Sequence, residues 1–310
     1  MAATECANCG TALAGRFCVK CGQDADAYRR PISALLSDAV DQFFGLDSRV
    51  VRTLTLLVAK PGELTRSYIA GHRQPYIPAL RLYLFITVVF FVALSLAGIA
   101  ILQLLPYRPG IDPPASYVEV SNDKAGRLGA RVLWFRPFEH VTLSDQQRAG
   151  IQKLRENLES QGNVASAVEG NRIVRVIASA NEDSVAFNGK VQTWIGRYLL
   201  LMMPLFALMT AVLLPSRFLI VDHLTFALHF HSFLFIALLA AALIASFVAP
   251  GSWLAFTWVV LLSVYLFLSL RRAYGLNFVG ALWRTVLLFG IYVAAVIYGL
   301  QETLFFVLSA

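Results

Sequence analysis

The chain has 310 residues, of which 57% are hydrophobic and only 15% carry a charge. Soluble domains have about 45–50% apolar and about 25% charged residues, so this composition excludes an ordinary soluble protein, and equally a collagen-like, disordered or disulfide-rich secreted one. The net charge of +7 would favour nucleic acid only if the basic residues clustered on a soluble surface. Because they mostly flank apolar stretches, we expect the lipid bilayer rather than nucleic acid as their partner.

Five apolar stretches approach the roughly 20 residues that a membrane-spanning helix needs. They are residues 82–105, 195–214, 224–248, 253–270 and 285–302. The first 20 residues contain no apolar signal-peptide core, so we expect the first span to act as the membrane anchor. The sequence therefore predicts an all-α polytopic membrane protein with five transmembrane helices, the last four of which form a compact antiparallel bundle.

The distribution of Lys and Arg predicts the orientation of these spans. Residues 1–81 contain ten Lys and Arg, and the turns after the second and fourth spans also contain Arg, whereas the turn between the third and fourth has neither. Short positively charged segments stay in the cytoplasm. We therefore expect the N-terminus inside, the C-terminus outside, and residues 106–194 on the extracytoplasmic side.

The four cysteines form two Cys-x-x-Cys pairs, Cys6 with Cys9 and Cys18 with Cys21. A two-residue spacer lets both sulfurs of a pair bind one ion, and the glycine after each pair can adopt the positive φ that such a turn needs. Four thiolates favour tetrahedral zinc and leave no open position for a substrate. Residues 1–24 are therefore predicted to form a structural zinc ribbon that presents a small surface to a cytosolic protein.

The cysteine pattern also allows two other uses. A pair of disulfides would need an oxidising compartment, and the predicted cytoplasmic location argues against it because thiols stay reduced there. Iron–sulfur or redox use of one pair remains compatible with the spacing.

Residues 25–81 are predicted to form cytosolic amphipathic helices. Apolar residues recur at helical spacing in Ser33–Gly45, and two further helices are expected over Asp47–Val58 and from Pro61 to Gly71. Apolar faces with scattered Arg fit helices that lie at the membrane interface. They fit equally well a small cytosolic cap that packs on the bundle, and the sequence does not separate the two.

Several short motifs follow the ribbon in a specific order. They are Arg52-Thr53, Pro61-Gly62, Tyr68–Arg73, Tyr76–Pro78 and Arg81–Tyr83, and later Pro204–Ala207 and Asp222–Phe233. This order resembles a family of bacterial inner-membrane proteins with an N-terminal four-cysteine zinc ribbon, whose shared domain has no assigned function. The resemblance implies a bacterial inner-membrane protein but no reaction, and it does not extend to residues 106–194.

Three of the five histidines lie in the third span: His223, His229 and His231, with Asp222 beside the first. Ionisable groups inside a membrane are candidates for metal ligands, proton carriers or substrate contacts. At about 100° per residue, however, the three histidines do not share one face of a straight helix. The alternative is that neutral histidines form hydrogen bonds between helices.

Residues 106–194 are too long for a turn and are predicted to form a small α+β soluble domain. A helix is expected from Ser144 to about Ser160, a strand over Arg172–Ala178, and a partner strand at Ser184–Phe187 across the polar residues 181–183.

The sequence contains no Gly-rich phosphate loop, nucleophile elbow or His-Glu-x-x-His motif, and we assign no catalytic residue. The leading hypothesis is a membrane-anchored scaffold or regulator whose cytosolic zinc ribbon docks a partner protein. The alternative is a small transporter or membrane enzyme that uses the histidines of the third span. Either is compatible with a homo-oligomer.

Overall fold

A computed structural model describes most of the membrane region and parts of the N-terminus. The residues that it describes are 5, 9–15, 18–21, 48–73, 75–106, 117–122, 126–139, 149, 176, 179–180, 183–214, 217–247 and 252–309. The chain divides into two compact units, Met1–Arg52 and Thr53–Ala310. The predicted helix over Ser33–Gly45 lies outside the described residues.

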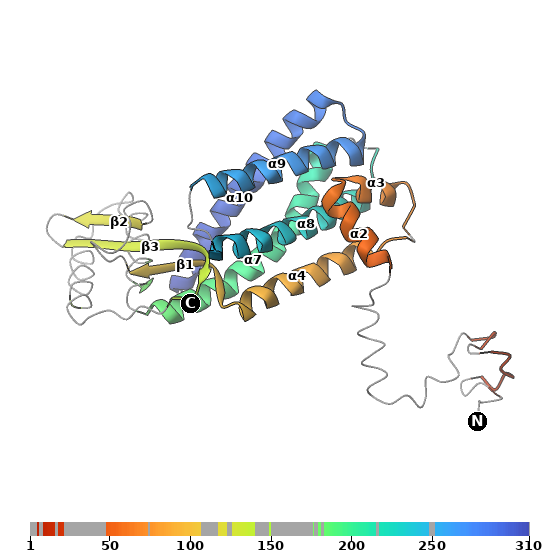
Figure 1. Cartoon of the computed structure of the whole chain (residues 1–310), viewed down its shortest axis with the longest axis horizontal. Helices are drawn as coiled ribbons and strands as arrows, with labels where there is room; N and C mark the ends of the chain where they lie inside the picture. Colours follow the sequence, from red (N-terminus) through yellow and green to blue (C-terminus); the bar gives the residue numbers. More distant parts are fainter. Residues whose placement is uncertain are drawn as a thin grey trace. The chain divides into compact units, whose positions relative to one another are not determined.

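Five helices are long and apolar enough to cross a membrane, as expected for a multi-pass membrane protein. They are α4 (Ala79–Leu96), α7 (Ser184–Leu213), α8 (Ile220–Phe247), α9 (Ser252–Tyr274) and α10 (Phe278–Ser309). Helix α8 is the central one: it packs against α4, α7 and α9 (Figure 1). In its most apolar stretch 67% of the residues are buried, whereas the other four helices bury 22–39% of theirs.

The first predicted span, residues 82–105, is wrong at its C-terminal end. Helix α4 ends at Leu96, and Gly98 follows with a φ of +62°, a conformation that glycine adopts readily. The next residues form the strand β1 (Ile99–Pro106) instead of continuing the helix. The 18 residues of α4 extend about 27 Å, close to the roughly 30 Å hydrocarbon core, so the shorter helix is still long enough to span it.

Three antiparallel strands form a small sheet in the order β1-β3-β2, with β2 at Tyr117–Asn122 and β3 at Gly126–Pro137. This sheet lies at the end of the bundle opposite to α3 (Figure 1). In the register of the β1–β3 pair, Leu102 lies opposite Trp134. The insert therefore contains a sheet, as predicted, but the sheet is built from other residues.

Both strands that the sequence predicted in this region are contradicted where the structure describes them. Val176, in the predicted strand Arg172–Ala178, is helical, and Ser184–Phe187 form the first turn of α7. The side chain of Asp183 accepts a hydrogen bond of 2.9 Å from the N–H of Ala186. Asp183, the last of the polar residues predicted to turn a hairpin, thus caps a helix instead. The predicted helix over 144–160 lies outside the described residues apart from position 149, which is helical.

Side-chain amides of α7 form hydrogen bonds with the edge of β1 that does not pair with β3. The N–H and the carbonyl oxygen of Leu104 both bond to the amide of Asn188, each at 2.8 Å. One turn later, Gln192 accepts from the N–H of Ile101 at 3.1 Å and donates to the carbonyl of Leu102. Two amides four residues apart thus take the place of a neighbouring strand, so the edge of β1 has no unsatisfied backbone groups at these positions.

Helices α2 (Ser48–Ala59) and α3 (Glu63–Ile69) confirm two of the helices predicted before the first span. The hydroxyl of Tyr265 on α9 donates to the carbonyl of Leu57 at 2.7 Å, and Arg272 donates to the carbonyl of Pro61 at 2.8 Å. Helix α3 contacts both α8 and α9. Of the two arrangements that the sequence allowed, the structure contains the cap that packs on the bundle.

Gly62 permits the closest approach within this cap, and its replacement tests the packing. Its φ is +78°, and an added Cβ would lie 2.5 Å from the carbonyl oxygen of Ser269 on α9. We expect Gly62→Ala to lower the free energy of unfolding by about 2–3 kcal/mol, because a left-handed residue with a Cβ costs about 1–2 kcal/mol and the overlap adds to this. Thermal unfolding of detergent-purified protein measures the change.

The matched control is Gly189→Ala in α7, where an added Cβ meets no atom within 4 Å. Alanine favours a helix by about 1 kcal/mol relative to glycine, so this variant should be as stable as the parent or more so. Equal stability of the Gly62 and Gly189 variants would contradict the packing of α3 on α9.

Candidate functional site

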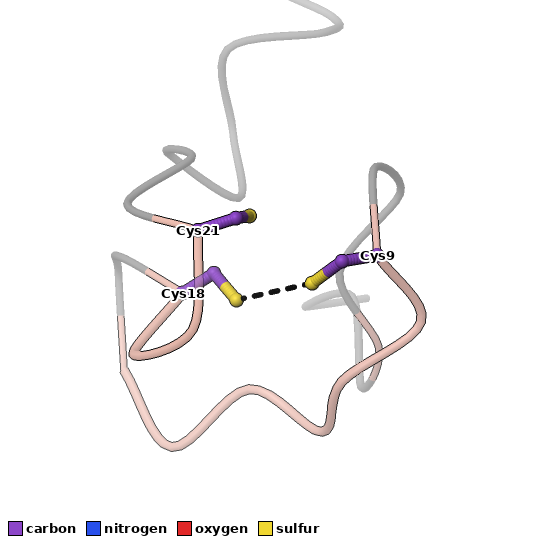
Figure 2. A group of neighbouring side chains, drawn as sticks. All are labelled: Cys9, Cys18 and Cys21. Carbon is purple, nitrogen blue, oxygen red and sulfur yellow. Dashed lines mark hydrogen bonds between the residues drawn. The ribbon is translucent and has the colours of Figure 1, made fainter.

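Three of the four predicted zinc ligands lie together. The sulfurs of Cys9, Cys18 and Cys21 are all within 4.8 Å of one another, and those of Cys9 and Cys18 are 3.6 Å apart. Figure 2 shows Cys9 on one segment of the chain and Cys18 and Cys21 on another, with the side chains of Cys9 and Cys18 directed toward each other. The fourth predicted ligand, Cys6, lies outside the described residues.

The local backbone explains how the cysteines meet. Glu5 and Ala12 form an antiparallel bridge that closes a loop around Cys9, and Gly10 turns that loop with a φ of +67°. This is the positive φ expected after the first Cys-x-x-Cys pair. Cys18 is buried, with 2% of its surface exposed, and Cys21 follows it after a tight turn.

Hydrogen bonding sets the charge state of the Cys9 sulfur. Its bonds with the side chain and the backbone of Thr11, whose hydroxyl oxygen lies at 3.3 Å, lower the pKa of the Cys9 thiol to about 6. At neutral pH Cys9 is therefore largely a thiolate, the form that binds metals. Backbone hydrogen bonds from Cys21 and Lys20 also favour the thiolate of Cys18, but burial and the neighbouring thiols outweigh them and raise its pKa to about 11.

The spacing of the sulfurs fits a tetrahedral thiolate site. Zinc–sulfur bonds of about 2.3 Å at tetrahedral angles place two sulfurs about 3.8 Å apart. The 3.6 Å between Cys9 and Cys18 agrees with this value, and Cys21 needs only a small movement to complete the triangle. The described residues can therefore hold a metal ion through three sulfurs.

The histidines of α8 do not form one site. Nδ1 of His223 lies 3.1 Å from the hydroxyl of Tyr274 on α9, and the two rings stack with their centroids 5.5 Å apart. Nδ1 of His231 lies 2.9 Å from the carbonyl oxygen of Ala227, and its Nε2 lies 3.0 Å from the hydroxyl of Tyr292 on α10. His223 thus connects α8 to α9, and His231 connects α8 to α10.

His229 connects α8 to the cap. Its Nδ1 lies 2.9 Å from the hydroxyl of Thr65 on α3, and its ring meets the ring of Tyr68 edge to face at 5.1 Å. The ring is buried, with 3% of its surface exposed, and its Nε2 has no hydrogen-bond partner among the described residues. Burial raises the pKa of the Tyr68 hydroxyl, which stays protonated and donates to the carbonyl of Ile77.

Asp222 has a local role at the start of α8. One of its carboxylate oxygens accepts a hydrogen bond of 3.0 Å from the N–H of Leu219, just before the helix begins at Ile220. A carboxylate in the first turn also interacts favourably with the helix dipole. The four polar residues predicted as one intramembrane site are therefore distributed over four separate sets of contacts.

Sequence reasoning did not identify the partners of these histidines. The hydroxyls of Thr65, Tyr274 and Tyr292 come from positions 51 to 164 residues away along the chain. The only signal in the sequence is the presence of hydroxyl groups in otherwise apolar helices, and this signal does not pair them.

Comparison with known families gives one match. The model of a family described as "Protein of unknown function (DUF3667)" matches residues 47–91, which include α2, α3 and the first part of α4. The matched region therefore contains the cap that packs on α8 and α9. Searches of curated proteins and of solved structures found no match.

Metal analysis of the detergent-purified full chain tests the cysteine site. We expect roughly one zinc per chain, and its loss in both Cys9→Ser and Cys6→Ser, because removing one of four thiolates opens a closed structural site. Inductively coupled plasma mass spectrometry measures the content. Val19→Ala, in the turn between Cys18 and Cys21, replaces a residue that is not a ligand and should keep the metal. A parent chain without zinc, or a Cys9→Ser variant that retains it, would contradict the assignment.

Proposed function

We propose that this chain is a membrane-anchored scaffold or regulator of the bacterial inner membrane whose N-terminal zinc ribbon docks a cytosolic protein. The observation that carries the proposal is the group of three cysteine sulfurs within 4.8 Å of one another. With Cys6 as the fourth ligand, a bound zinc ion is fully coordinated by protein and supplies folding free energy instead of chemistry.

The ribbon offers a small, rigid contact surface. Between Cys18 and Cys21 the chain turns through Val19 and Lys20, which are both exposed; Val19 has 81% of its surface accessible. Two metal ligands flank this turn, so binding zinc fixes its conformation and lowers the entropy cost of docking. An apolar side chain beside a cation suits a partner surface with an apolar pocket and an acidic rim.

The distribution of positive charge supports a cytosolic ribbon. Residues 1–81, which precede the first predicted span, contain ten Lys and Arg. Short basic segments remain on the cytoplasmic side. The ribbon precedes α2 and α3 along the same chain, and α3 packs on the bundle. The membrane part would thus tether the ribbon, and any partner bound to it, to the membrane.

Site-specific photo-crosslinking in intact cells tests this proposal. A benzoyl-phenylalanine at position 19 of the full chain should give one discrete adduct, because a docked partner contacts the exposed turn directly. The adduct should disappear in Cys9→Ser, while the membrane bundle remains folded by its thermal unfolding in detergent. The matched control carries the photoreactive residue at the exposed Ala14, away from the ligand turn. An adduct at position 19 that persists in Cys9→Ser would refute the proposal.

A second candidate function is a small transporter or membrane enzyme that uses the histidines of α8. One observation favours it: Nε2 of His229 is buried and has no partner among the described residues. A buried imidazole nitrogen without a partner costs free energy, and such a cost is maintained where the group is needed to carry a proton or contact a substrate.

Paired variants distinguish this candidate from a purely structural role. Both nitrogens of His231 are satisfied by Ala227 and Tyr292, so His231→Ala should lower stability. If His229 works through Nε2, then His229→Ala should abolish the cellular phenotype at normal abundance. Thr65→Val, which removes only the partner of Nδ1, should retain that phenotype. Normal behaviour of the His229 variant would eliminate this candidate.

A further inference from the structure

An apolar cavity of about 450 Å³ lies between the sheet and α10. Its size falls within the range of about 300–1,000 Å³ that is typical of small-molecule sites. It is separate from the cysteine cluster and is lined by residues none of which was predicted as functional. The described lining residues are Leu102, Leu104, Ala130, Val132, Trp134, Val176, Ile297, Leu300, Gln301, Leu304 and Phe305.

Two regular surfaces form the walls. On the sheet side, alternate residues of β1 and β3 face the cavity, and the register places Leu102 opposite Trp134 and Leu104 opposite Val132. On the other side, α10 contributes a stripe at helical spacing that begins at Ile297. The space is therefore an elongated slot between a helix and a sheet.

The lining determines the chemical class of the ligand. Among the described lining residues none is charged, and the polar groups are the amide of Gln301 and the indole N–H of Trp134. A charged or strongly polar molecule would lose its hydration here without compensation. The cavity instead suits a flexible hydrocarbon, whose binding is driven by burial of apolar surface.

The position of α10 indicates where such a hydrocarbon comes from. The cavity wall on α10 belongs to the stretch Phe278–Val307, which is long and apolar enough to span the bilayer. Ile297 has 60% of its surface exposed, and Val286, which has 67% exposed, lies on the same face of α10 about three turns earlier. The rim of the cavity is thus continuous with the lipid-facing surface of α10, so acyl chains are its immediate neighbours.

The sheet wall is fixed before any ligand binds. One edge of β1 pairs with β3, and the other is held by the amides of Asn188 and Gln192 on α7. Since both edges of the strand are bonded, the wall does not move inward to fill the space, and an empty cavity of this size would be costly.

We propose that this cavity binds one acyl chain of a membrane phospholipid. The chain enters beside Ile297 and lies along the sheet against Trp134, which is itself 49% exposed. Gln301, exposed at the rim, donates a hydrogen bond to an ester carbonyl of the glycerol backbone, while the head group remains in the interface. The phospholipid thereby bridges the insert and the last membrane span.

Fluorescence quenching by a brominated phospholipid tests the proposal in the full chain. The four tryptophans other than Trp134 are replaced by Phe, and the purified protein is titrated in detergent with phosphatidylethanolamine that carries a dibromostearoyl chain. We expect saturable quenching of Trp134 with one lipid per chain. In Leu300→Phe, whose larger ring fills the slot, the affinity should fall by about tenfold or more.

Three comparisons make the result decisive. Ile291→Phe adds the same ring to a lipid-facing position of α10 and should bind like the parent. Ala130→Val narrows the cavity from the sheet side and should weaken binding even if Leu300→Phe fails to fold. Free dibromostearic acid should quench more weakly, since its charged carboxylate would lose hydration beside a lining that holds no cation among the described residues. Non-saturable quenching, equal affinity of Leu300→Phe and Ile291→Phe, or saturation by the fatty acid alone would each overturn the proposal.

Discussion

A hydrocarbon environment offers no hydrogen bonds, so a polar group inside the bundle is stabilised when it finds a partner within the protein. Most of the contacts that determine this architecture provide such partners. Arg284 donates to the carbonyl of Leu213 at 2.9 Å, and Arg217 donates to the carbonyl of Tyr274 at 3.1 Å, so both cations connect helix ends. The same constraint pairs the hydroxyl of Tyr292 with His231. Each of these bonds also fixes how two helices are placed, because neither partner can exchange the other for water.

Helix α8 occupies the centre because its polar residues point in several directions. A helix with one polar face could lie at the edge of the bundle, but His223, His229 and His231 reach α9, α3 and α10 respectively. Each bond can form only if a neighbour is present on that side, so α8 must be surrounded. Its high buried fraction is the consequence. The contact of α3 with both α8 and α9 then couples the cap to the most constrained helix of the membrane part.

The sequence predicts those features that depend on composition along a short segment. Apolar length located the five spans, and the two Cys-x-x-Cys pairs located the cysteine cluster together with the turn at Gly10. The prediction for residues 99–105 was wrong because their composition fits a membrane helix and a buried strand equally well. Only Gly98 marked the change from helix to strand. Asp183 could have been recognised as a helix cap. The partners of the histidines, the amides that hold β1 and the cavity beside α10 depend on contacts between distant segments, which no local pattern contains.

The two compact units draw their stability from different sources. The bundle buries a continuous apolar core, whereas the proposed zinc ribbon, residues 1–24, would be too short to bury a core and would depend on its metal. Loss of the ion would therefore unfold the ribbon without disturbing the helices. Under the proposed function, because metal affinity depends on deprotonated thiols, the availability of zinc would control docking independently of the fold that anchors the ribbon. Such separation would suit the proposed scaffold, because the anchor would stay constant while the docking module is switched.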